Sequence, residues 1–244
     1  MRPITTGEKT LASATCPHRA YLVAGTRPWS RRVFEEIRTL PDQWHLISRK
    51  EELTPELLET IQASFVFFLH WSWVVPDPII EHYRCVCFHM TDVPYGRGGS
   101  PLQNLIVRGH RKTKLSALRM TKELDAGPVY RKKDLSLEGG AEGIYVRATE
   151  LAAGMIAKLT SSDVDPEPQA GDPVLFRRRR ASDSELPRLE TLWGVFDFIR
   201  MLDADGYPPA YVDREGLRFE FTRAALYDGR VRANVTVTRL EGSS

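Results

Sequence analysis

The stretch "AYLVAGTRPWSRRVFEEIRTL" (20–40) joins a short apolar run to a helical pattern, and this combination sets the fold class. "AYLVAG" predicts a buried strand that ends at Gly25, and Pro28 stands where a helix begins. Apolar side chains then recur at helical spacing, at Val33, Ile37 and Leu40. A strand followed at once by an amphipathic helix indicates a βα unit of an α/β sheet.

The same alternation continues to about residue 90. In order, the patterns predict a strand, a helix, a strand, a short helix and a strand, at "WHLIS" (44–48), "TPELLETIQ" (54–62), "FVFFLH" (65–70), "PDPIIEHY" (76–83) and "RCVCFH" (84–89). Strands that are apolar along their whole length indicate a parallel sheet covered on both faces. The sequence therefore predicts an α/β fold with an open, mostly parallel, Rossmann-like sheet.

A change in composition divides the chain near residue 160. "TSSDVDPEPQAGDP" (160–173) is polar and rich in proline and acidic residues, which predicts a linker over 161–176. Beyond it, a helix and two strands are expected at "LETLWGVFDFIRML" (189–202), "LRFEFTRAAL" (217–226) and "RVRANVTVTRL" (230–240). The predicted organisation is an N-terminal extension (1–19), a catalytic domain (20–160), the linker, and a small C-terminal α+β subdomain (177–244).

Composition narrows the class of protein. The formal net charge of +2 gives no reason to expect a nucleic-acid partner. Three cysteines, Cys16, Cys85 and Cys87, make no disulfide framework. No apolar run approaches the roughly 20 residues of a membrane span, and the first residues lack a secretory pattern. We expect a cytoplasmic protein without a membrane segment.

The stretch "HMTDVPYGRGGSP" (89–101) follows the last of these strands. In open parallel sheets, ligands bind beyond the carboxyl ends of the strands, which is where His89 stands. Pro94 and the glycines after it exclude a helix until Ser100, which we expect to cap a helix that begins at Pro101. The simpler interpretation is a turn-rich connection with a histidine at the edge of the core.

A second polar element lies in "KELDAGPVY" (122–130), where Asp125 precedes Ala-Gly-Pro. Alone, such an aspartate is most simply a turn former. Paired with His89, it suits acyl transfer to an amine. The carboxylate would orient the imidazole, which would accept a proton from the amine or stabilise the developing oxyanion.

Both segments resemble the signature of the folate-dependent formyltransferases. That signature has a histidine followed at fixed offsets by residues that here are Thr91, Pro94, Arg97-Gly98 and Pro101, and "LDAGPV" is similar to its D-x-G-P segment. "FVFFLHWSWVVP" (65–76) also stands where the family has a strand lining the folate cleft. The resemblance covers residues 20–160 and implies the formyltransferase type of sheet, N10-formyltetrahydrofolate as cosubstrate, a primary amine as acceptor, and no metal.

The resemblance also implies site residues. His89 and Asp125 take the catalytic positions, and Cys87 stands where the family has an asparagine that donates to the formyl oxygen. A thiol is a weak donor, and loss of one such donor costs about 10²–10³ in rate. Asn104, Thr91 or a backbone N–H could take over this role, and the sequence does not choose among them.

Further residues are expected to contact the two substrates. We assign folate binding to Trp71, Pro94, Arg97, Gly98 and Leu124, and acceptor binding to Thr91, Tyr95, Asn104 and Arg177. Two of these have simpler alternatives: Trp71 could be core packing, and Arg177, the first residue of "RRRR", could be a solvated linker end. The spacing Cys85-x-Cys87-x-His89 could suggest a metal, but no second cluster accompanies it, so we favour strand packing.

The C-terminal third bears on the acceptor. "FDFIRMLDADGYPPAY" (196–211) resembles the segment that follows the linker in sugar N-formyltransferases, which implies a nucleotide-linked amino deoxysugar as acceptor and a homodimer. Two alternatives stay open at this stage. One is an enzyme like the methionyl-tRNA formyltransferases, and the other is a folate-binding relative with weakened catalysis.

Overall fold

The computed structural model describes residues 19–162 and 164–240. Cys16 and nearly all of the predicted extension 1–19 lie outside the described residues. The strands are β1 (Ala20–Gly25), β2 (Gln43–Ile47), β3 (Ala63–Leu69), β4 (Cys85–His89), β5 (Tyr95–Gly98), β6 (Lys112–Arg119), β7 (Val129–Ser136), β8 (Val174–Phe176), β9 (Ala210–Arg214), β10 (Leu217–Tyr227) and β11 (Arg230–Arg239). The helices are α1 (Pro28–Ile37), α2 (Pro55–Ile61), α3 (Asp77–His82), α4 (Pro101–Val107), α5 (Ala141–Ser161) and α6 (Leu192–Arg200), with short 3₁₀ turns at Lys50–Glu52 and Ala181–Ser184.

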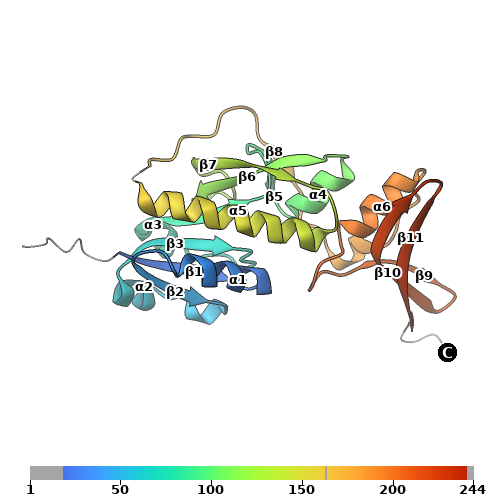
Figure 1. Ribbon diagram of the computed structural model, residues 1–244, viewed down its shortest axis with the longest axis horizontal. Helices are drawn as coiled ribbons and strands as arrows, with labels where there is room; N and C mark the ends of the chain where they lie inside the picture. Colours follow the sequence, from blue (N-terminus) through green and yellow to red (C-terminus); the bar gives the residue numbers. More distant parts are fainter. Residues whose placement is uncertain (1–18, 163, 241–244) are drawn as a thin grey trace, which may run out of the picture.

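A six-stranded sheet in the order β2-β1-β3-β4-β6-β7 forms the core of the larger domain (Figure 1). The first four strands in this order are parallel, and β6 and β7 are antiparallel to their neighbours, so the predicted mostly parallel sheet is confirmed. Gly25 pairs with Leu69, and Phe68 pairs with Cys87. The carboxyl ends of β1, β3 and β4 therefore lie at one edge of the sheet.

Helices cover both faces of the sheet, which explains strands that are apolar along their whole length. Alternate residues of β1 and β3, such as Val23 and Phe67, pack in one cluster with α1, α4 and α5. The residues between them, such as Leu22 and Val66, pack in a second cluster with α2 and α3. Burial of both sets is the main stabilising term for the domain.

The small C-terminal unit consists of α6 and the antiparallel sheet β11-β10-β9, lying beside α4 in Figure 1. The helix, β10 and β11 were expected from the sequence, whereas β9 was not. Buried Arg200 anchors the unit, because it ion-pairs with Asp197 and donates to the carbonyl oxygens of Leu137 and Gly139 at 2.6 and 2.8 Å. None of the described helices is both long and apolar enough to cross a bilayer.

The segment between α5 and β8, read as a linker from its composition, is hydrogen-bonded to the larger domain. Glu167 and Val129 exchange backbone hydrogen bonds of 2.9 and 2.7 Å, and β8 pairs in parallel with β5. This pairing demands glycine at position 98, where φ is +105° and a Cβ atom would lie 2.5 Å from the Phe176 carbonyl oxygen. The segment that contains β8 therefore lies beside the stretch 89–101 before the chain reaches α6.

Candidate active site

His89 and Asp125 meet at the carboxyl edge of the sheet. The imidazole Nδ1 lies 3.5 Å from Asp125 Oδ2, and both side chains are about nine-tenths buried, with exposed fractions of 8% and 10%. The other ring nitrogen, Nε2, lies 2.7 Å from the Gly96 carbonyl oxygen. Because a carbonyl oxygen only accepts, Nε2 carries the hydrogen of this bond. The ring therefore stands between two acceptors and is a donor in this arrangement.

Asp125 is held by a tight turn. Its backbone is left-handed, with φ at 54°, and its Oδ2 accepts the Gly98 N–H at 2.9 Å. Gly127 is required two residues later because a Cβ atom there would lie 1.8 Å from the Arg119 carbonyl oxygen. Gln169 donates to the Asp125 and Gly127 carbonyl oxygens at 2.8 Å each. The D-x-G-P segment is thus both a turn and the carrier of the carboxylate.

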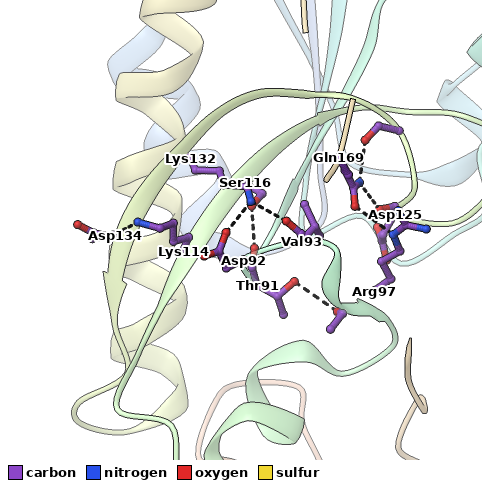
Figure 2. A network of polar contacts seen from close by, with 12 residues as sticks. Thr91, Asp92, Val93, Arg97, Lys114, Ser116, Asp125, Lys132, Asp134 and Gln169 are labelled. Atoms are coloured by element: carbon purple, nitrogen blue, oxygen red, sulfur yellow. Dashed lines mark hydrogen bonds and ion pairs between the residues drawn. The ribbon is translucent and has the colours of Figure 1, made fainter. Parts of the chain in front are cut away.

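The loop after β4 is tied down by polar contacts from β6 and β7, which Figure 2 shows. Ser116 donates to the Thr91 carbonyl oxygen at 2.7 Å. Lys132 pairs with the Asp92 carboxylate at 2.5 Å and donates to the Val93 carbonyl oxygen at 2.6 Å. The Val93–Pro94 peptide bond inside this loop is cis. These contacts fix the backbone that carries Gly96, the acceptor beneath His89.

Cys87 lies on the same strand as His89, two residues earlier, and its side chain is partly buried against the second core cluster. Burial and the nearby Asp125 carboxylate raise the pKa of the Cys87 thiol well above its usual range. The group is therefore an uncharged thiol at neutral pH. It leaves the site with a weak donor where the resemblance implied a carboxamide.

Neither of the side chains proposed to replace that carboxamide has a free donor. Thr91 is fully buried and donates to the Gly96 carbonyl oxygen at 3.3 Å. The Asn104 amide donates to three backbone carbonyl oxygens, those of Gly99, Ser100 and Arg177. Asn104 therefore connects α4 to Arg177, the residue that follows β8. Of the three alternatives, a backbone N–H remains.

The residues predicted to contact folate lie on three segments, since Pro94, Arg97 and Gly98 belong to the stretch 89–101 and the other two lie on separate loops. Trp71 follows β3 and packs edge-on against Trp73, with ring centroids 4.8 Å apart, while Leu124 stands beside Asp125 and is 69% exposed. Lys122 links the Leu124 loop to α3, since its Nζ lies 2.6 Å from the Glu81 carboxylate in that helix. Trp73 and Val74, in the loop after β3, are likewise exposed apolar side chains.

Other predicted residues face elsewhere. Tyr95 turns away toward His110, whose Nε2 lies 3.0 Å from the tyrosine oxygen. Arg177 is exposed and pairs with Asp183 at 3.0 Å. Ser100 stands at the N-cap position of α4 but does not cap it, because its Oγ accepts the Arg179 N–H at 3.0 Å. The predicted side-chain cap is therefore wrong, whereas Pro101 does begin the helix.

A partly buried histidine next to the site was not anticipated. His70 follows β3 with φ at 53°, and its Nε2 lies 3.0 Å from Thr149 Oγ1 on α5. Its ring meets Trp29 and Tyr145 edge-on, with centroids 5.7 and 5.2 Å away. Burial, and then the charge of Arg27, lower the pKa of His70 to about 4. The ring is therefore neutral at physiological pH and belongs to the packing between β3 and α5.

Among the residues that the structure describes, no three His, Cys, Asp or Glu side chains lie close enough together to bind a metal ion. The thiol of Cys85 is fully buried and lies 3.6 Å from the Ile79 carbonyl oxygen. Burial raises the pKa of Cys85 to about 12. Both described cysteines thus serve as uncharged packing residues of β4.

The solved methionyl-tRNA formyltransferase of Clostridium thermocellum matches this chain with a TM-score of 0.88 and 38% identity, over 91% of this chain and 99% of that one. The chain belongs to the formyltransferase family. The methionyl-tRNA formyltransferase of Rickettsia prowazekii (strain Madrid E) is 35% identical over 187 residues, which is 73% of this chain and 61% of that enzyme. Residues 181–238 match the family described as the methionyl-tRNA formyltransferase C-terminal domain.

Two more distant structures share the fold of this chain. A sugar N-formyltransferase from Shewanella sp. FDAARGOS_354 has a TM-score of 0.67 at 14% identity and covers 86% of this chain and 98% of that one. HypX from Aquifex aeolicus, solved in complex with tetrahydrofolic acid, has a TM-score of 0.70 at 17% identity, over 85% of this chain and 38% of that one. The chain spans roughly half the length of the first curated relatives it matches.

Three residues of the site escaped the sequence analysis. Ser116 and Lys132 lie in stretches where apolar and polar residues alternate, so in the sequence they look like ordinary solvent-facing strand residues. Gln169 lies in a segment without any periodic pattern. A signal for Gln169 was nevertheless present, because it is the one glutamine among acidic residues and prolines in the stretch 160–173. Only its contacts reveal what it does.

Proposed function

We propose that this chain transfers a formyl group from N10-formyltetrahydrofolate to a primary amine. The observation that carries the proposal is the buried approach of His89 Nδ1 to Asp125 Oδ2, at 3.5 Å, beside the stretch that resembles the family signature. Membership of the formyltransferase family supports it. The exposed apolar side chains of the Trp71 and Leu124 loops support a folate at this edge.

The reaction exchanges one carbon–nitrogen bond for another. The amine nitrogen bonds to the formyl carbon, the bond from that carbon to N10 of the folate breaks, and the proton lost by the amine balances the proton gained by N10. His89 Nε2 donates to the Gly96 carbonyl oxygen in this structure, so its N–H would have to leave that carbonyl oxygen to stabilise the negative charge that develops on the formyl oxygen. Asp125 holds the orientation of the ring through Nδ1.

For the acceptor we infer the amino group of a methionyl-tRNA. The C. thermocellum structure, at 38% identity over nearly the whole of both chains, and the match of residues 181–238 support this choice. The stretch 196–211 had favoured a nucleotide-linked amino sugar, with methionyl-tRNA as an alternative. The comparisons favour that alternative, because the sugar N-formyltransferase named above shares only the fold at 14% identity.

A nucleotide-linked amino sugar is the second candidate. It is favoured by the near-balanced charge of the C-terminal unit, where the partly buried Arg218 pairs with Asp213 at 2.8 Å. A tRNA-binding surface would be expected to carry unpaired cationic side chains. A homodimer, which the resemblance to sugar enzymes implied, stays a prediction that sedimentation can test.

The test compares acceptors under one set of conditions. The purified chain is given N10-formyltetrahydrofolate and either methionyl-tRNA or UDP-, dTDP- and GDP-linked amino sugars, and kcat/KM is measured for each. We expect transfer to methionyl-tRNA, with kcat/KM falling steeply as salt rises. Transfer to an amino sugar alone would overturn the choice of acceptor. Folate binding by calorimetry without transfer to any amine would overturn the enzymatic proposal.

A further inference from the structure

Gln169 connects the two halves of the site. Its Nε2 donates to the carbonyl oxygens of Asp125 and Gly127, at 2.8 Å each, and its Oε1 accepts from Arg97 Nε at 3.0 Å. Figure 2 shows its side chain between Arg97 and Asp125. Both amide hydrogens are used and the oxygen is used as well. A partly buried carboxamide with this set of partners is held in one orientation.

The backbone presents this side chain at a fixed place. On one side, Glu167 and Val129 are joined by their pair of backbone hydrogen bonds. On the other side, the Val174 N–H donates to the Pro94 carbonyl oxygen at 3.1 Å, and β8 continues beside β5. Gln169 lies between these two anchored points. Its contacts with the catalytic loops are therefore part of the folded segment rather than of a freely moving linker.

The bonds of Gln169 act on the groups that orient His89. Asp125 has a left-handed backbone, and the remaining backbone bond within its turn, from the Ala126 N–H to the Glu123 carbonyl oxygen, is long at 3.3 Å. The carboxylate that faces His89 also accepts the Gly98 N–H, and Gly98 directly follows Arg97. Gln169 therefore restrains Asp125 directly, through the Asp125 carbonyl oxygen. It restrains Gly98 indirectly, through the guanidinium of the neighbouring Arg97.

The second partner of Arg97 does not substitute for Gln169. Glu123 lies 3.5 Å from Arg97 Nη1, but its side chain is 78% exposed, so this ion pair is weak in water. Gln169 therefore supplies the less exposed of the two side-chain partners of Arg97, at 3.0 Å from its Nε.

We propose that Gln169 is a positioning residue for formyl transfer, which acts by holding the Asp125 turn and Arg97 in register so that Asp125 faces His89. The inference rests on the proposed function. A displacement of about 1 Å at a reacting group costs about 10² in rate, so the effect belongs in kcat rather than in binding. Gln169→Glu keeps the length and the acceptor for Arg97 but loses the donor to both carbonyl oxygens.

The experiment measures steady-state kinetics of Gln169→Ala, Gln169→Glu and a control in the same segment, Glu167→Gln, whose side chain is exposed. We expect kcat to fall roughly 10- to 100-fold in both Gln169 variants, with KM for the folate within about threefold and the control unchanged. In Asp125→Asn, a further Gln169→Glu should cost no more than about threefold, because the residue acts through Asp125. The inference would be overturned if the losses in kcat of Asp125→Asn and Gln169→Glu multiplied in the double variant, or if Gln169→Ala kept the wild-type kcat.

A second measurement separates this inference from the proposed function. Hydrogen exchange of the Gly98 amide, which donates to Asp125, is followed by NMR in the same variants. We expect exchange about tenfold or more faster in Gln169→Ala than in the wild type, and no change in Glu167→Gln. Faster exchange in a protein that formylates no amine would retain the restraint and reject the activity. Unchanged exchange would remove the restraint itself, whatever the activity.

Discussion

Asp125 Oδ2 lies 3.5 Å from His89 Nδ1 and is shared with the Gly98 N–H at 2.9 Å. This one carboxylate oxygen thus contacts the imidazole and also the stretch 89–101, whose Gly96 carbonyl oxygen accepts from His89 Nε2. The ring is oriented from both sides by groups on two separate loops. This sharing makes the geometry of the pair sensitive to every contact that holds either loop.

Replacing the carboxylate should affect turnover far more than stability. Asp125→Asn keeps an acceptor for the Gly98 N–H but removes the charge beside His89, so we expect kcat for formyl transfer to fall by at least ~10². Asp134→Asn is a matched control, because Asp134 is exposed and pairs only with Lys114 at a strand surface. Equal rates for Asp125→Asn and the wild type would remove the orienting role.

Restoring the missing carboxamide should accelerate the reaction. Cys87→Asn places a strong donor where the thiol now stands, and one such donor contributes about 10²–10³ in favourable cases. We expect a gain in kcat of about tenfold or more, measured with saturating folate and acceptor.

The control for this experiment is Cys87→Ala. Because the thiol is a weak donor and remains uncharged, its loss should change kcat by no more than about threefold. A large loss in Cys87→Ala, with no gain in Cys87→Asn, would mean that the thiol itself takes part in the reaction.

His70 should make the protein sensitive to mild acid. The pKa of His70 is about 4 in the folded protein, below the ordinary value of 6.5. Between pH 6.5 and pH 4, His70 is therefore protonated in the unfolded chain but neutral in the folded chain. Stability is therefore lost as pH falls from about 6.5 to about 4, by on the order of 3 kcal/mol from this residue.

Urea unfolding at a series of pH values between 7 and 4 tests this loss. His70→Gln, which cannot titrate, should flatten the pH dependence of the unfolding free energy across that window. His82→Gln, a change in an exposed histidine at the end of α3, serves as the control and should keep the wild-type slope. Identical slopes in the wild type and His70→Gln would contradict the assignment.

Two glycine substitutions should shift stability in opposite directions. In Gly127→Ala the new Cβ would meet the Arg119 carbonyl oxygen at 1.8 Å, and we expect a loss of about 3 kcal/mol or more. Gly154 lies exposed inside α5 with nothing within 4 Å of an added Cβ, so Gly154→Ala should gain about 0.5–1 kcal/mol. Thermal unfolding of both variants provides the measurement, and a tolerated Gly127→Ala would refute the tight turn.

Most of the sheet and its helices were predictable because the signal is local. Apolar runs at 20–25, 65–70 and 84–89 cannot face water on either side, so they indicate central strands wherever they occur. Pro28 and Pro101 begin helices as expected, and Pro55 begins α2 in the same way, since the fixed φ of proline suits a first helical turn. The strand β8 escaped because a three-residue strand in a proline-rich segment forms only through its distant partner.

The sequence by itself determined the α/β order, the two polar segments and the family that they resemble, because each depends on residues close together in the chain. Only the tertiary structure decided which of these residues share a site. It brings Asp125 to His89, commits Asn104 and Thr91 to backbone carbonyls, and draws Gln169 against Arg97. Hydrogen bonds between segments far apart in sequence have no periodicity, so their donors and acceptors are matched only when the chain has folded.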